Sequence, residues 1–122
     1  MGMEKEEIVK EIKRFFSLKR GDVKIERSWS EIVVKFKEDV ELTEEGYERL
    51  YDFLKSLGFL PSDIWESAVI EAWGYRSWAS VDVFKNYRNN IELSVYYTRV
   101  WAKGETRYFV NKIDIEETED IE

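Results

Sequence analysis

The chain contains neither cysteine nor histidine among its 122 residues. The absence of cysteine excludes disulfides, thiolate metal ligands and cysteine nucleophiles. The absence of histidine removes the usual general base near neutral pH and the commonest transition-metal ligand. Serine–histidine–aspartate triads, zinc fingers and the HExxH zinc motif are therefore excluded. We predict a protein that is not an enzyme and that uses neither a cofactor nor a metal ion.

Long apolar runs are also missing from the sequence. No segment approaches the roughly 18–20 apolar residues that a membrane span needs. The charged start, "MGMEKEEIVKEI", has no apolar h-region of the kind found in secretory signals. We therefore expect a cytoplasmic protein with no membrane partner. A single proline and a high content of Glu and Lys are compatible with a thermostable, heat-adapted protein.

Charge is unevenly distributed along the chain. Acidic residues outnumber basic ones by 26 to 19, and the net charge of −7 argues against a general nucleic-acid binder. Residues 67–113 nevertheless hold seven basic and four acidic residues, whereas residues 114–122 hold six acidic residues and none that is basic. We interpret residues 1–113 as a single domain and residues 114–122 as an acidic tail, either disordered or competing for a basic surface.

Apolar residues recur at helical spacing in two segments. Residues 4–19 form the first predicted helix, with Gly21 as its stop. Residues 43–57 form the second, in which Thr43 is the N-cap and Gly58 follows the C-terminus. The apolar stripe of the second helix consists of Tyr47, Leu50, Tyr51, Leu54 and Leu57.

The rest of the chain alternates between apolar and polar residues, which predicts strands. Residues 22–28 and 31–37 are the first two strands, and the pattern returns from residue 77 onward. Residues 64–73 fit both a helix and a strand, and we favour a strand over 67–73. The predicted fold is an α+β two-layer sandwich of order α-β-β-α-β-β-β-β. A mainly antiparallel sheet of five or six strands packs on two amphipathic helices.

Turn residues set the predicted pairing of the last strands. The dipeptides Asn89–Asn90 and Lys103–Gly104 are typical of two-residue hairpin turns, and "GYRS" at 74–77 would make a four-residue loop. The cross-strand pairs that follow are Trp73–Trp78, Trp78–Trp101, Arg99–Tyr108 and Asp82–Tyr97.

These pairings give the sheet two different faces. One face is small and aliphatic, and we expect the helices to pack on it. The other is aromatic and charged, and we expect it to face solvent, a partner or a ligand. The alternative is that the helix at 43–57 buries the aromatic face. The aliphatic set is Ala68, Ile70, Ala72, Ala79, Val81, Val83, Val100 and Phe109. The predicted binding residues on the aromatic face are Trp73, Trp78, Tyr97, Arg99, Trp101 and Tyr108.

The leading functional hypothesis is a non-catalytic interaction module, of adaptor or inhibitor type. It would bind a protein partner, or a second copy of itself, through the aromatic face. The acidity of the chain favours a basic partner, such as a nucleic-acid-binding protein. The alternative is single-stranded nucleic-acid binding through the same aromatic and arginine residues. Glu71 and Asp82 could face each other diagonally as an acid–base pair, but no nucleophile, metal cluster or glycine-rich phosphate loop accompanies them.

Overall fold

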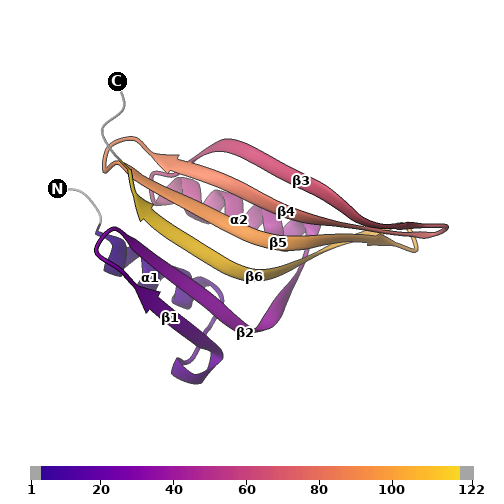
Figure 1. Ribbon diagram of the computed structural model, residues 1–122, viewed down its shortest axis with the longest axis horizontal. Coiled ribbons are helices and arrows are strands. Elements are labelled where there is room, and N and C mark those ends of the chain that lie inside the picture. Colours follow the sequence, from indigo (N-terminus) through magenta and orange to yellow (C-terminus); the bar gives the residue numbers. More distant parts are fainter. Residues whose placement is uncertain (1–3, 119–122) are drawn as a thin grey trace.

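The computed structural model describes residues 4–118 as two α-helices, a short 3₁₀ turn and one six-stranded antiparallel sheet (Figure 1). This confirms the predicted α+β class and the order of the elements. Within residues 4–118, neither helix has the length and apolar composition that crossing a bilayer requires. The elements are α1 (Lys5–Phe15), η1 (Arg20–Asp22), β1 (Val23–Arg27), β2 (Glu31–Thr43), α2 (Glu44–Ser56), β3 (Leu60–Ala72), β4 (Tyr75–Asn86), β5 (Ile91–Ala102) and β6 (Glu105–Glu117).

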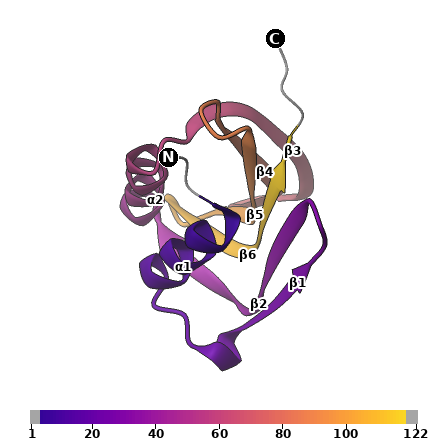
Figure 2. The ribbon, with the colours of Figure 1, turned by 90° about the vertical axis from the view of Figure 1, so that its left-hand side faces the viewer.

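The strand order places β1 and β3 at the two edges of the sheet. The order is β1-β2-β6-β5-β4-β3, so α2 connects β2 to the opposite edge. Both helices lie on the same side of the curved sheet (Figure 2). Because side chains alternate across a strand, this inner face takes every second residue. The largest fully buried apolar residues of the core are Ile8, Ile12, Val34, Leu50, Leu54, Phe59, Phe84, Leu93, Val95, Val110, Ile113 and Ile115.

The helices cover the face that we expected to stay open, so this part of the prediction is wrong. Phe84 and Val95 share the inner face with Asp82 and Tyr97, and all four are buried. On the outer face the small residues stay more accessible, since Ala79 is exposed and Val81 is half-buried. The physical reason is that the side chains of the inner face have more apolar area to bury than those of the outer face. The inner face carries Phe, Leu and Ile side chains, and burying them stabilises the fold more than burying Ala and Val.

One predicted hairpin turn is confirmed and two are corrected. Lys103 and Gly104 form a two-residue turn with φ of 54° and 75°, and Arg99 pairs with Tyr108 as predicted. Residues 87–90, however, form a four-residue loop. Trp73 and Gly74 form the other turn, so that Ala72 pairs with Tyr75.

The length of this loop is explained by the hydrogen bonds of Asn86, the residue that precedes it. The Asn86 side chain accepts a hydrogen bond from the Asn89 backbone N–H at 3.2 Å and donates one to the Leu57 carbonyl, also at 3.2 Å. These bonds hold Asn86 at the end of the strand, where it pairs with Ile91. The β4–β5 register therefore moves by two residues, and Trp78 faces Arg99 instead of Trp101. Because the shift is even, the side chains of β4 and β5 keep their predicted faces, whereas Ala68 of β3, predicted for the aliphatic face, lies opposite Trp78 on the inner face.

The helix and strand boundaries follow local signals to different extents. In α2, the Gly46 N–H donates to Thr43 Oγ1 at 3.1 Å, which confirms the predicted cap. α1 ends at Phe15, earlier than predicted, and Gly21 lies in η1 instead of ending a helix. Residues 64–72 of the ambiguous segment belong to β3, a strand of 13 residues, as favoured, whereas Trp73 lies in the turn that follows.

The predicted acidic tail begins too early at residue 114. Asp114 and the three residues after it are the last four residues of β6. Ile113 and Ile115 alternate into the core, whereas Asp114 and Glu116 point to the outer face. Apolar alternation therefore extends the strand into the acidic segment. The remainder of the predicted tail, residues 119–122, lies outside the described residues.

Replacing Gly58 with alanine should destabilise the protein. Gly58 has φ of 94°, and a Cβ there would lie 2.9 Å from Asn86 Nδ2. The backbone conformation by itself should lower the free energy of unfolding by about 1–2 kcal/mol. Gly21→Ala is the matched control, because nothing lies within 4 Å of its Cβ position. Urea denaturation should separate the two variants, and equal stability would contradict this account of the α2 terminus.

Candidate functional site

A cleft of about 560 Å³ lies between α2 and the inner face of the sheet. α2 contributes residues that recur every three or four positions, so they share one side of the helix. The sheet contributes residues from four neighbouring strands, β3 to β6. The lining residues are Glu44, Tyr47, Glu48, Tyr51, Asp52, Lys55, Ile64, Glu66, Asp82, Tyr97, Arg99 and Tyr108.

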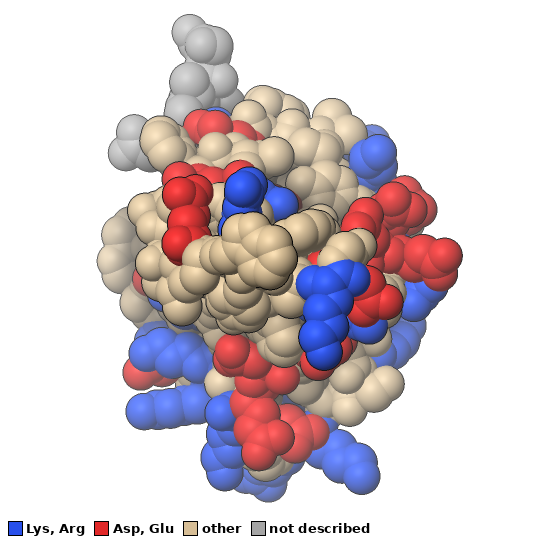
Figure 3. All heavy atoms as spheres, turned by 90° about the vertical axis from the view of Figure 1, so that its right-hand side faces the viewer, with Lys and Arg blue, Asp and Glu red and all other residues tan. Residues whose placement is uncertain are grey.

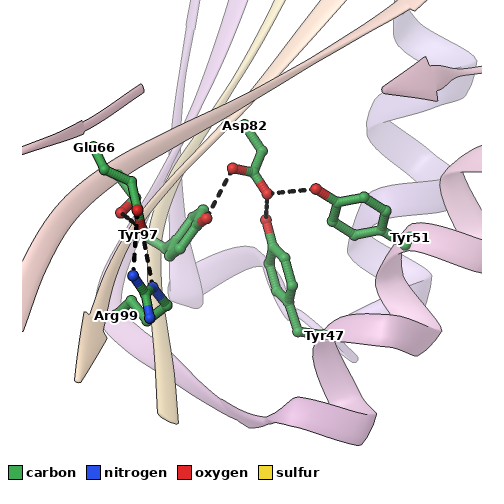
Figure 4. Close-up of polar contacts among 7 residues, drawn as sticks. Tyr47, Tyr51, Glu66, Asp82, Tyr97 and Arg99 are labelled. Carbon is green, nitrogen blue, oxygen red and sulfur yellow. Dashed lines mark hydrogen bonds and ion pairs between the residues drawn. The ribbon is translucent and has the colours of Figure 1, made fainter. Parts of the chain in front are cut away.

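The carboxylate of Asp82 lies at the centre of this cleft and is only 2% exposed. It accepts hydrogen bonds from three phenols: Tyr47 at 2.5 Å, Tyr51 at 2.8 Å and Tyr97 at 2.8 Å (Figure 4). Tyr47 and Tyr51 are four residues apart on α2, and Tyr97 comes from β5. The carboxylate therefore joins the helix to two strands.

The three phenols are held in their protonated form. Burial raises the pKa of Tyr47 far above its ordinary value, and the negative charge of Asp82 raises it further. The pKa values of Tyr51 and Tyr97 are raised by burial first and by their hydrogen bonds to Asp82 second. Each hydroxyl keeps its proton and uses it in the hydrogen bond to Asp82, so toward any other group the phenol oxygen can only accept hydrogen bonds.

A second polar cluster ties β3 to the sheet beside this network. The Arg99 guanidinium donates to both carboxylate oxygens of Glu66, from Nε at 2.9 Å and from Nη2 at 3.2 Å (Figure 4). Ser80 Oγ donates to Glu66 at 3.2 Å. Arg99 Cζ also lies 4.0 Å from the centroid of the Trp78 ring. The bidentate ion pair holds the guanidinium in place, and together with Ser80 and Trp78 it links β3, β4 and β5.

Four of the six predicted binding residues come together here. Tyr97, Arg99 and Tyr108 line the cleft, and Trp78 lies against Arg99. The other two lie elsewhere. Trp73 occupies the β3–β4 turn with a relative exposure of 103%, and Trp101 is 37% exposed in β5. The predicted row of three tryptophans is therefore absent from the described sheet, because the turns move Trp73 and Trp101 away from Trp78.

The contribution of α2 to the cleft is not predicted from the sequence, in which Tyr47 and Tyr51 belong to the apolar stripe of a helix and have no polar partner. A signal was present, since two phenols on an otherwise leucine-rich stripe need a buried acceptor. The predicted acid–base pair is also corrected. Glu71 lies opposite Arg76 and Asp82 lies opposite Ile64, so the two carboxylates do not face each other.

Three carboxylates gather on the opposite, outer face of the sheet. Oxygen atoms of Glu31, Asp114 and Glu116 lie within 4.8 Å of one another. They could offer oxygen ligands to a hard cation, although acidic side chains often lie this close without one. Burial, and then the neighbouring Glu31 and Glu116, raise the pKa of Asp114 to about 7, while Lys112 opposes the shift. We assign no metal to this cluster.

Removing the Tyr47 hydroxyl should cost more stability than removing that of Tyr51. Tyr47→Phe deletes a buried hydrogen bond to a charged group, which should lower the free energy of unfolding by about 1.5–3 kcal/mol. Tyr51 is half-buried, so water can replace its hydroxyl in Tyr51→Phe. Tyr87→Phe, at a residue that is 69% exposed, is the control. Chemical denaturation should give the order Tyr47, Tyr51, Tyr87, and a neutral Tyr47→Phe would contradict the network.

Stability should fall with rising pH through the titration of Asp114. Its pKa of about 7 lies above the ordinary value of 3.8, so the folded state binds a proton that the unfolded state has lost. The resulting stabilisation is complete below about pH 4 and is lost as the pH rises to 7. Asp114→Asn should therefore stabilise the protein more at pH 8 than at pH 5, as measured by urea unfolding. Asp39→Asn, an exposed residue of β2, controls for the lost charge, and an equal effect in both variants would refute this account.

Neither the family models nor the curated proteins compared with this chain match it. No residue role can therefore be transferred from a relative.

Proposed function

We propose that this protein is a non-catalytic interaction module that binds an extended segment of a protein partner along β3. One observation carries the proposal. All 13 residues of this edge strand are exposed. An edge strand presents unpaired backbone N–H and C=O groups, to which another chain can add a strand. The large apolar side chains that β3 leaves between 46% and 63% exposed are Leu60, Ile64, Trp65, Val69 and Ile70.

The charge of β3 favours a basic partner. Residues 60–72 contain Asp63, Glu66 and Glu71 and no lysine or arginine. A second copy of the chain would bring one acidic strand against another, which like-charge repulsion disfavours. A segment that alternates apolar and basic residues would bury the apolar side chains of β3 and neutralise its carboxylates. We therefore favour a different protein over self-association.

The aromatic residues predicted from the sequence extend this surface. Trp73, in the turn that ends β3, and Trp101, at the end of β5, offer exposed ring area near the same end of the sheet. Figure 3 looks onto this end and shows uncharged side chains in the middle of the view, with both signs of charge around them. Exposed tryptophans bury a large area at little entropic cost, as binding hot spots do.

Single-stranded nucleic-acid binding has less support. It needs free arginines beside stacked aromatic rings. Arg99 is engaged with Glu66, and the cleft around it holds more carboxylates than cations. Phosphate groups would be repelled by such a lining. This alternative stays a prediction from the sequence.

A synthetic ten-residue peptide of alternating lysine and valine tests the proposal. It should protect the amides of β3 from hydrogen exchange, and a peptide of alternating glutamate and valine should not. Trp65→Lys places a positive charge on β3 and should weaken peptide binding by roughly tenfold. Trp29→Lys is the matched control, because Trp29 is 89% exposed between β1 and β2, at the other edge of the sheet.

Two other outcomes would overturn the proposed partner. Light scattering that gives twice the monomer mass, with β3 amides protected in the free protein, would assign the edge to a second copy. Protection of β3 by a single-stranded oligonucleotide, and not by the peptide, would favour the nucleic-acid alternative. Equal effects of Trp65→Lys and Trp29→Lys would remove β3 from the binding surface.

A further inference from the structure

We propose that the cleft between α2 and the sheet is a binding site for an alkylammonium group. This goes beyond the proposed function, because it assigns a ligand chemistry to the cleft itself and needs no strand on the free edge of β3. Three properties of the lining carry the inference: its hydrogen-bonding capacity, its charge and its apolar wall.

Three of the four tyrosine hydroxyls that line the cleft can act only as acceptors toward a ligand. Tyr47, Tyr51 and Tyr97 all donate a hydrogen bond to Asp82, so their oxygen atoms present only lone pairs to any further group. A ligand with hydroxyl or carboxylate acceptors would find no proton on these phenols. An ammonium group carries three donors and no acceptor, which matches them.

The charge of the lining also selects a cation. Five carboxylates line the cleft, and the two cations are Lys55 and Arg99. Arg99 is bound to Glu66, so these two side chains largely neutralise each other. What remains is Asp82 at the centre, three carboxylates along α2 and one lysine. Because protein walls of low dielectric strengthen such a field, the cleft should attract cations and repel anions. The α2 carboxylates are Glu44, Glu48 and Asp52.

The walls beside these carboxylates suit the hydrocarbon part of an alkylammonium. Ile64 lines the cleft from β3 and stays 57% exposed. Tyr51 and Tyr108 are half-buried lining residues, and the negative faces of aromatic rings favour a nearby cation. The cleft volume of about 560 Å³ accommodates a chain of several carbons. A small inorganic cation would leave these apolar walls unused.

The same ammonium chemistry can come from two sources. One is a free polyamine, and the other is a lysine side chain of a protein segment. The second source would connect the cleft to the partner strand, since Ile64 and Glu66 belong to β3. Spermidine and Nα-acetyl-lysine methylamide therefore serve as two separate probes. Tighter binding of spermidine would assign the free amine, and tighter binding of the lysine derivative would assign the side chain.

The primary test compares 1,6-diaminohexane with 1,6-hexanediol, which has the same carbon chain and no charge. Calorimetric titration at low salt should show saturable binding of the diamine to the folded protein, and the affinity should fall as salt is added. Tryptophan fluorescence, to which Trp78 beside Arg99 contributes, gives a second readout. Equal binding of the diol, or no saturable binding of the diamine, would overturn the proposal.

Substitutions of residues that line the cleft test whether the diamine binds there. Tyr51→Phe removes one acceptor and should weaken diamine binding by roughly tenfold. Glu48→Gln combined with Asp52→Asn should weaken it by a similar factor. Glu38→Gln combined with Asp39→Asn removes the same net charge from exposed residues of β2 outside the cleft lining, and it is the matched control. Equal weakening by both double variants would mean non-specific attraction and would refute the site.

The two proposals can fail independently. Protection of β3 by the lysine–valine peptide without diamine binding would overturn the ammonium site and leave the interaction module intact. Diamine binding without peptide protection would overturn the partner strand and leave the ammonium site. Circular dichroism of each variant distinguishes loss of binding from loss of the fold.

Discussion

The buried carboxylate of Asp82 is the constraint on which this half of the molecule depends. A charge that is 2% exposed costs several kcal/mol unless hydrogen bonds replace its water. Tyr47 and Tyr51 supply two of these bonds from α2, and Tyr97 supplies the third from β5. The requirement fixes the side of α2 that faces the sheet. It also orients the phenols so that their lone pairs remain for other groups, which gives the cleft its chemical character.

β3 belongs to both candidate surfaces, and its charges shape each of them. Glu66 binds Arg99 and anchors the strand, while Ile64 on the same face forms part of the cleft. Asp63 and Glu71 leave the edge acidic. Charged side chains on an edge strand discourage pairing with a like strand, so the same residues that favour a basic partner also guard against aggregation. Without these charges, the exposed apolar side chains of β3 would lack this protection against pairing with a like strand.

Much of the fold was predictable because its signals are local. Thr43 and Gly58 mark the ends of α2, and Lys103–Gly104 marks a turn, since capping and turn geometry depend on a few adjacent residues. The β4–β5 loop was not predictable in this way. Asn89–Asn90 has the composition of a two-residue turn, but Asn86 bonds to Leu57 at the end of α2 and fixes a longer loop. That contact joins residues 29 positions apart.

The sequence by itself determined the class of the fold, the order of its elements, and the membership of Tyr97, Arg99 and Tyr108 in one surface. It did so because helical and strand periodicities are properties of the chain. Tertiary structure decided which face of the sheet is buried and which residues complete the cleft. That choice depends on total apolar area and on finding donors for Asp82, and two of these donors lie on a helix more than 30 positions away. Neither the total apolar area of a face nor the donors of Asp82 can be read from a local sequence pattern, because both depend on residues that are far apart in the chain.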